Sequence, residues 1–177
     1  EKMHLLRSHG ICRDQKLFTK ASEGDWYYQQ LDLGFNYRMT ELQAALGLSQ
    51  IKRLDEFVSI RHQRQRYYDA ILKDLLITIP FQDPDCYSAL HLYPIQVGSF
   101  DKSRKQIFNE LRENGIGVNV HYIPIYSQPY YQQMGFNKDD FPKSQSYYKN
   151  TISIPMFHGL TIKMQDEIVK ILTSVLS

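Results

Sequence analysis

Two short segments of the sequence carry side chains that could hold an anionic or polar ligand. In the first, residues 34–41, Asn36 can donate an amide hydrogen to a phosphate oxygen and Arg38 offers a planar pair of donors. The helix predicted to follow would add free backbone N–H groups and a dipole that favours an anion. The pattern indicates a phosphate-facing corner. The alternative is a structural loop in which Arg38 pairs with a carboxylate.

The second segment, residues 118–126, reads as a strand that ends in His121 and Tyr122 just before Pro124. Polar tips at the rim of a sheet often line a pocket. An aromatic strand end can equally well cap a hydrophobic core. The residues alone leave both interpretations open.

Other chemistries find little support in the sequence. It contains no hydrolase nucleophile motif, no glycine-rich phosphate loop and no helical histidine pair that would bind a metal. Cys12 and Cys86 fit neither a metal site nor a disulfide framework, which indicates free thiols in a reducing cytoplasm. The net charge of +2 comes without a basic block, so nucleic acid is not an expected partner. No apolar run approaches the roughly 20 residues of a membrane span.

The first residues read like the middle of a helix that runs to a glycine cap at Gly10. Because the chain opens at Glu1, we expect it to be part of a longer protein. Residues 11–38 form an irregular connection of a length that is usually functional or disordered. The three consecutive aromatics at 26–28 argue against disorder.

From residue 39 to 75 the spacing of apolar residues predicts one long helix with Thr40 as its N-cap. A second apolar stripe, Leu42, Leu46 and Phe57, predicts burial between two bodies. The stripe should therefore be exposed where a missing domain would pack. Gly47 lies mid-helix, where glycine is unfavourable, and suggests the close approach of another backbone.

The rest of the chain alternates short strands with helices. Pro94 places its strand at an edge or bulge, Asp101 and Thr161 are expected to cap helices, and Met164 is expected on the inner face of the last helix. We predict an α+β domain in which helices cover a small, mainly antiparallel sheet. Strands are expected at 76–81, 90–97, 116–120 and 152–155, and helices at 101–114, 128–134, 143–148 and 161–175.

Four stretches together resemble the DegT/DnrJ/StrS family of nucleotide-sugar aminotransferases. They are residues 7–10, 33–55, 117–126 and 153–161, and their order and spacing match the family over essentially the whole chain. The most specific is the Asn-Tyr-Arg block followed by the helix with Ala-Ala-Leu-Gly.

The resemblance implies the C-terminal small domain of a fold-type-I aminotransferase, led by a long interdomain helix. Residues 1–38 would be the tail end of the large domain and an interface loop, and residues 39–177 the small domain with its linking helix. The family implies a cytoplasmic homodimer with active sites at the subunit interface.

The resemblance also implies a chemistry, in which pyridoxal phosphate takes an amino group, usually from glutamate, and passes it to a keto-sugar attached to a nucleotide. Asn36 would reach the cofactor phosphate in the partner's site. Arg38 and His121 would contact the substrate, with Tyr122 beside them and Tyr37 as a further candidate. The segments around residues 121–126 and 156–159 are most similar to family members that aminate a UDP-linked 4-keto-6-deoxy-N-acetylhexosamine on the way to pseudaminic acid.

The residues that would do the covalent chemistry are missing from this sequence. Transamination needs a Schiff-base lysine, a carboxylate at the pyridine nitrogen and a group on the ring face. In the family all three lie upstream of the matched part, so we expect no catalytic residue here and an inactive isolated chain. The alternatives are a non-enzymatic dimerisation or sugar-binding module of the same ancestry, and an unrelated α+β ligand-binding domain.

Overall fold

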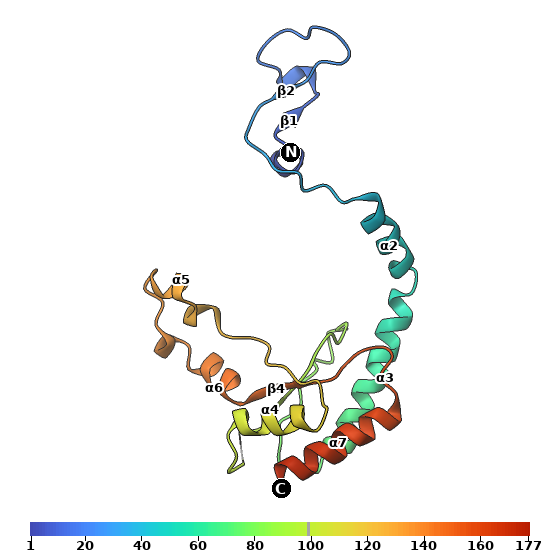
Figure 1. The fold of residues 1–177 in the computed structure, drawn as a ribbon, viewed down its shortest axis with the longest axis vertical. Helices are drawn as coiled ribbons and strands as arrows, with labels where there is room; N and C mark the ends of the chain where they lie inside the picture. Colours follow the sequence, from blue (N-terminus) through green and yellow to red (C-terminus); the bar gives the residue numbers. More distant parts are fainter. Residues whose placement is uncertain (99) are drawn as a thin grey trace. The chain divides into compact units, whose positions relative to one another are not determined.

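The computed structural model describes residues 1–98 and 100–177, which form two compact units, Glu1–Arg53 and Leu54–Ser177 (Figure 1). Among the described residues, the whole hydrophobic core belongs to the second unit. The domain division between residues 38 and 39 stays a prediction.

The first unit is built from short elements. They are α1 (Lys2–Leu6), β1 (Ile11–Cys12), a 3₁₀ turn (Gln15–Leu17), β2 (Gln29–Gln30) and α2 (Glu41–Ile51). β1 and β2 pair antiparallel. The expected helix up to Gly10 is wrong in its length: α1 ends at Leu6, and His9 adopts a φ of +61° that no right-handed helix can contain.

Two glycines let the backbones of the first unit pack directly on each other. A Cβ atom on Gly34 would lie 2.2 Å from the Gly10 nitrogen, and one on Gly10 would lie 1.8 Å from the Asp32 carbonyl oxygen. Only glycine fits at either position. The close approach expected at Gly47 is not made within the described chain, where no atom lies within 4 Å of a Cβ at that position.

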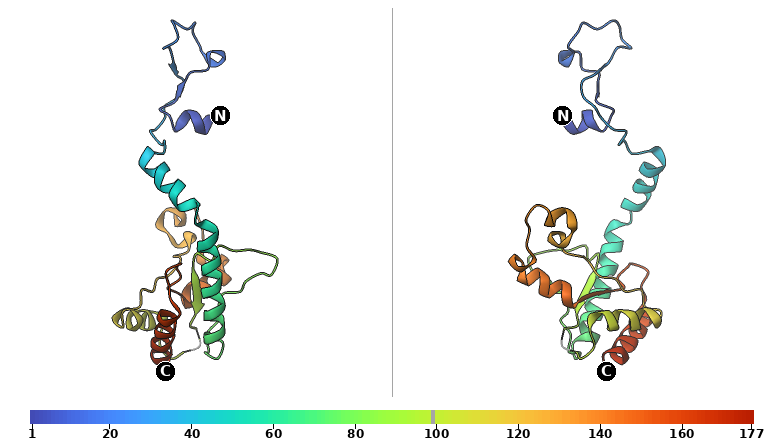
Figure 2. Two further views of the ribbon diagram at one scale, coloured as in Figure 1. Left: turned by 90° about the vertical axis from the view of Figure 1, so that its right-hand side faces the viewer. Right: turned by 60° about the vertical axis from the view of Figure 1, so that its left-hand side comes forward.

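The second unit contains the two longest helices of the described chain (Figure 2). The single helix expected over residues 39–75 is wrong. It stops at Ile51, and a new helix starts at Leu54, because the Arg53 N–H bonds to the Gln50 carbonyl three residues back and so tightens the last turn. The elements are α3 (Leu54–Leu72), β3 (Tyr93–Gln96), α4 (Arg104–Glu113), α5 (Pro129–Gln132), α6 (Pro142–Asn150), β4 (Thr151–Ile154) and α7 (Ile162–Leu176), with 3₁₀ turns at Ile125–Ser127 and Lys138–Asp140.

The sheet of the second unit has β3 and β4 paired antiparallel, with Tyr93 opposite Ile154. The strands expected at 76–81 and 116–120 are wrong, because each is reduced to one isolated bridge beside this pair, Thr78↔Gln96 and Asn119↔Ser153. Both segments curl through a bond that spans only two residues. The Ile77 N–H bonds to the Leu75 carbonyl, and the Val118 N–H bonds to the Ile116 carbonyl.

Pro94 occupies the edge position that its missing N–H predicts. It lies opposite Ser153, whose own N–H and C=O both bond to Asn119 on the other side of β4. The Pro94 and Ser153 pair is therefore a non-hydrogen-bonded one, and the proline removes no bond between the two strands.

Helices α3, α4 and α7 pack core residues against this sheet, which confirms the expected α+β class. The expected cap at Asp101 is wrong: Ser103 caps α4 through a capping box with Gln106. Thr161 caps α7, but Met164 is 42% exposed and does not face the core. The fully buried side chain in its place is Gln165, which donates to the Arg64 carbonyl.

The predicted apolar stripe is only partly exposed. Leu42 and Leu46 on α2 are 84% and 63% exposed, which confirms the expectation for the first unit. Phe57 on α3 is half-buried instead, because its ring stacks on His158 with centroids 4.2 Å apart.

Candidate functional site

Asn36 lies in an extended segment that is hydrogen-bonded to the last residue of α1 and to the residue after it. The Phe35 N–H bonds to the Leu6 carbonyl, and the Tyr37 N–H bonds to the Arg7 carbonyl. The rings of Phe35 and Tyr37 stack on each other with centroids 5.0 Å apart. Because successive side chains of an extended segment alternate sides, the Asn36 amide points away from this aromatic pair. The amide is exposed and makes no hydrogen bond to any described residue.

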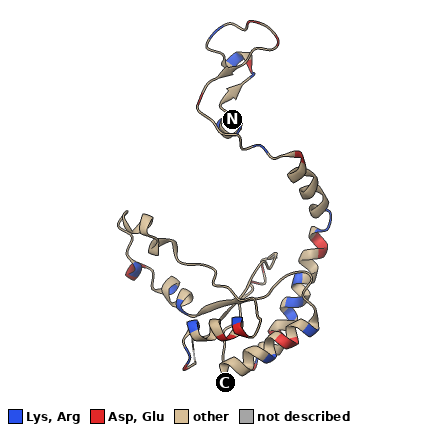
Figure 3. Cartoon of the chain, viewed as in Figure 1, with Lys and Arg blue, Asp and Glu red and all other residues tan. Residues whose placement is uncertain are grey.

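Arg38 is also exposed, and its guanidinium has no carboxylate partner in the described chain. The alternative in which Arg38 pairs with a carboxylate therefore finds no support. Arg38 borders an open hollow of about 910 Å³ within the first unit, whose walls also carry Lys2 and Asp32. Acidic and basic side chains are interspersed along the chain (Figure 3).

The N-terminus of α2 contributes less to anion binding than the sequence suggested. Thr40 is the N-cap, as predicted, and its hydroxyl accepts from the Gln43 N–H while the Gln43 side chain accepts from the Thr40 N–H. Only the N–H groups of Glu41 and Leu42 remain for an external acceptor, and the Glu41 carboxylate opposes a second anion there. Asn36 and Arg38 are thus the main donors of this corner.

The position of Asn36 depends on Gly34, and we predict that Gly34→Ala disrupts it. The added Cβ would meet backbone atoms of residues 6, 9 and 10 at 2.2–2.7 Å, so the two segments must separate. Amide hydrogen exchange at Phe35 and Tyr37 should become about 10 to 100 times faster as their bonds open.

The matched control for this prediction is Gly47→Ala, where nothing lies within 4 Å. That substitution should leave the exchange of Phe35 unchanged and stabilise α2 by up to about 1 kcal/mol. Unaltered protection of Phe35 in the Gly34 variant would show that the close approach does not hold Asn36 in place.

His121 and Tyr122 lie in the second unit, just after the bridge between Asn119 and Ser153. The His121 Nδ1 atom lies 2.9 Å from the Ser153 hydroxyl oxygen. The Tyr122 ring packs edge-on against the imidazole at 4.7 Å and is 68% exposed, so it does not cap a core. His121 itself is half-buried.

The structure thus brings the candidates together in two groups. Asn36, Tyr37 and Arg38 share one segment of the first unit, and His121 and Tyr122 are neighbours in the second. Sequence reasoning missed Ser153, which contacts His121 from 32 residues away. A lone serine within a strand gives no signal of such a contact.

The donor set partly fits pyridoxal phosphate. The free amide of Asn36 and the free guanidinium of Arg38 suit a phosphate. Lysines fit less well, because those of the described chain are exposed to solvent except for Lys102. The Lys102 ammonium donates to Glu110 and to the Val175 carbonyl at 2.8 and 2.7 Å, so it is already engaged.

The described residues hold no group of three or more histidine, cysteine, aspartate or glutamate side chains that could bind a metal ion. None of their helices combines the length and apolar character needed to cross a bilayer.

Comparison with known proteins identifies the relatives of the chain. The model of the DegT/DnrJ/EryC1/StrS aminotransferase family matches residues 1–173. The spore coat polysaccharide biosynthesis protein SpsC of Bacillus subtilis is 35% identical over 96% of the chain and 45% of its own length. The UDP-4-amino-4,6-dideoxy-N-acetyl-beta-L-altrosamine transaminase of Helicobacter pylori is 34% identical over 92% of the chain and 41% of its own length.

A solved structure agrees with these sequence matches. Helicobacter pylori PseC, an aminotransferase involved in the biosynthesis of pseudoaminic acid, superimposes with a TM-score of 0.83 at 31% identity. The superposition covers 99% of this chain and 45% of PseC. The chain therefore spans less than half the length of the relatives that it matches.

Proposed function

The chain belongs to the DegT/DnrJ/EryC1/StrS aminotransferase family, and we propose that it is the C-terminal part of an enzyme that aminates a nucleotide-linked 4-keto-6-deoxy sugar. Pyridoxal phosphate is the proposed cofactor and glutamate the proposed amino donor. The observation that carries the proposal is the family match over residues 1–173, which includes the exposed amide of Asn36 and guanidinium of Arg38.

The similarity to the Helicobacter pylori transaminase and to PseC favours a UDP-linked N-acetylhexosamine as the sugar substrate. SpsC is equally similar in sequence and is named for spore coat polysaccharide biosynthesis. The UDP sugar is the first substrate to test.

The residues of this chain would bind and orient the reactants. Pyridoxal phosphate, when bound, supplies the electron sink for amino transfer. Asn36 would donate its amide hydrogens to the cofactor phosphate in the partner's site. Arg38 and His121 would hold the nucleotide sugar, with the exposed phenol hydroxyls of Tyr37 and Tyr122 as further donors.

The covalent step would belong to a lysine outside residues 1–177. We propose that a preceding segment supplies it, because the matched relatives are more than twice as long as the part that this chain covers. The active protein would be a cytoplasmic homodimer with sites between the subunits. The isolated chain would then be inactive.

Borohydride trapping tests this proposal. The 177-residue chain is mixed with pyridoxal phosphate, reduced, digested and analysed by mass spectrometry, beside a full-length protein with a complete upstream domain. We expect one stoichiometric attachment site upstream and only trace, scattered attachment to lysines of the chain. Stoichiometric attachment at one lysine within residues 1–177, abolished by its replacement with arginine, would refute the proposed division of labour.

A second candidate function is a non-enzymatic module that dimerises or binds sugars. One observation favours it: residues 54–177 have a hydrophobic core of their own, whereas the described chain offers no free buried lysine. Binding of a UDP sugar by the chain without any cofactor requirement, in a full-length protein that lacks transaminase activity, would support this candidate.

A further inference from the structure

We propose that Ser153 is a positioning residue for His121: its hydroxyl fixes the imidazole so that Nε2 faces the nucleotide sugar. The inference rests on the proposed function, in which His121 binds that substrate. Ser153 itself would touch neither the substrate nor the cofactor.

The backbone of Ser153 is held on both sides. Its N–H donates to the Asn119 carbonyl at 2.8 Å, and its carbonyl accepts from the Asn119 N–H at 3.2 Å. On the opposite side it is paired with Pro94 in β3. The side chain is only 4% exposed, and its neighbours Ile152 and Ile154 are core residues. The sheet therefore fixes the direction of the Cα–Cβ bond of Ser153, and the contact with His121 selects the position of the hydroxyl.

The hydroxyl and the imidazole satisfy each other. The Ser153 Oγ atom lies 2.9 Å from His121 Nδ1 and has no other side-chain partner among the described residues. Turning the ring by 180° would place a carbon atom against the hydroxyl and leave that buried group without a partner. A hydroxyl can donate or accept, so the contact holds the ring in either neutral tautomer.

The same contact decides which nitrogen is left for a ligand. With Nδ1 engaged, Nε2 is the remaining polar atom of the ring, and no described residue bonds to it. The exposed Tyr122 ring packs edge-on beside the imidazole and supports its orientation. Such an Nε2 atom can form one directed hydrogen bond to an oxygen of the nucleotide sugar.

Serine is an unusual choice for this position if packing alone matters. A buried strand favours β-branched or aromatic residues, and β4 otherwise consists of isoleucine and threonine. A buried serine hydroxyl would destabilise the fold unless it had a hydrogen-bond partner. His121 is that partner.

A double-substitution cycle in the full-length enzyme tests the inference. Ser153→Ala should raise KM for the nucleotide sugar about fivefold to tenfold, the effect of one hydrogen bond, without changing kcat for the half-reaction with glutamate. His121→Ala should raise the same KM at least as much. Adding Ser153→Ala to His121→Ala should cause little further change, because the serine would have no ring left to position.

Two controls separate the possible failures. Ser153→Thr keeps a hydroxyl and should restore KM to within about twofold of the parent enzyme. If His121→Ala leaves KM unchanged, the proposed role of His121 in substrate binding is wrong. If His121→Ala raises KM but Ser153→Ala adds its full effect in that background, the positioning role is wrong while the proposed function stands.

Discussion

Under the proposed function, Arg38→Ala in the full-length protein should lower kcat/KM for the nucleotide sugar by about 100-fold or more. A guanidinium that makes two charge-assisted hydrogen bonds to an anionic substrate contributes about 3 kcal/mol, which corresponds to this factor. The side chain is exposed and has no ion-pair partner in the described chain, so its removal should cost little stability. Steady-state kinetics and a thermal melt of the same preparation measure both quantities.

Asn36→Ala should act on the cofactor instead. Loss of one donor to the phosphate should weaken pyridoxal phosphate binding by about tenfold, with a smaller change in KM for the sugar. The matched control is Arg66→Ala, an exposed arginine on α3 that should leave both constants unchanged. If Asn36→Ala and Arg38→Ala both preserve full activity, the assignment of this corner to the active site is wrong.

Mixed dimers add a geometric test of the same assignment. A subunit that carries Asn36→Ala is paired with one that lacks the upstream Schiff-base lysine. Each dimer then keeps one Schiff-base lysine. If Asn36 reaches across the interface, its substitution leaves intact the lysine site of its own subunit and weakens the site of the partner. Activity of this mixed dimer should therefore stay close to that of a dimer with one lysine and no other change. Loss of activity would show that Asn36 acts within its own subunit.

Local signals in the sequence predicted the ends of several elements. Thr40 and Thr161 cap their helices through their own hydroxyls, and α4 ends at Glu113, next to the expected end at residue 114. The cap of α4 could have been found as well, because Ser103 stands three residues before Gln106 in a capping-box spacing. These features depend on residues close together in the sequence.

Features that depend on distant partners could not be predicted in this way. The segments 76–81 and 116–120 each form only one bridge, to Gln96 and to Ser153, although the burial of Ile116 and Val118 alternates as in a strand. Arg61 donates one guanidinium nitrogen to the carbonyls of Leu90, His91 and Met156, a contact that no local pattern announces.

The candidate site shows the same division. The residue types of Asn36 and Arg38 and their place before a helix are visible in the sequence, and the structure keeps both side chains free. The pairing of Gly10 with Gly34 and of His121 with Ser153 depends on segments more than 20 residues apart. A local sequence pattern cannot specify contacts between segments that lie so far apart in the sequence.

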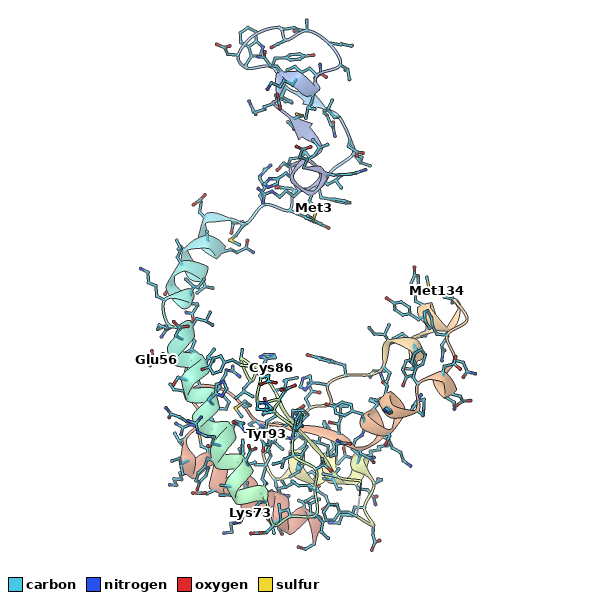
Figure 4. The ribbon with its side chains drawn as sticks, turned by 180° about the vertical axis from the view of Figure 1, so that it is seen from behind. Met3, Glu56, Lys73, Cys86, Tyr93 and Met134 are labelled. Carbon is cyan, nitrogen blue, oxygen red and sulfur yellow. The ribbon has the colours of Figure 1, made fainter. Side chains whose placement is uncertain are left out.

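Two buried tyrosines should make the second unit lose stability above pH 10. Tyr68 on α3 and Tyr93 on β3 are fully buried, and their rings lie 5.0 Å apart; Tyr93 can be seen in the interior (Figure 4). Burial raises the pKa of the Tyr68 hydroxyl well above its ordinary value of 10.0. Burial also raises the pKa of Tyr93, and so does its hydrogen bond to the Asp69 carboxylate at 2.5 Å.

The direction in which the free energy of unfolding changes with pH follows from the number of protons bound in the folded and unfolded states. Below pH 10 both tyrosines are protonated whether the chain is folded or unfolded, so they add no pH dependence. Above pH 10 the unfolded chain releases both protons and the folded chain keeps them, so unfolding becomes easier as the pH rises. Each retained proton lowers the free energy of unfolding by about 1.4 kcal/mol per pH unit. Together the two tyrosines should remove about 5 kcal/mol between pH 10 and pH 12.

Urea unfolding of the chain at several values between pH 9 and pH 12 measures this slope. The pair Tyr68→Phe and Tyr93→Phe should remove most of the decline above pH 10, even if it changes the stability at neutral pH, because phenylalanine has no proton to release. Tyr130→Phe, at an exposed position on α5, should leave the decline intact. An equally steep decline in the double variant would mean that these hydroxyls titrate in the folded state as they do in the unfolded chain.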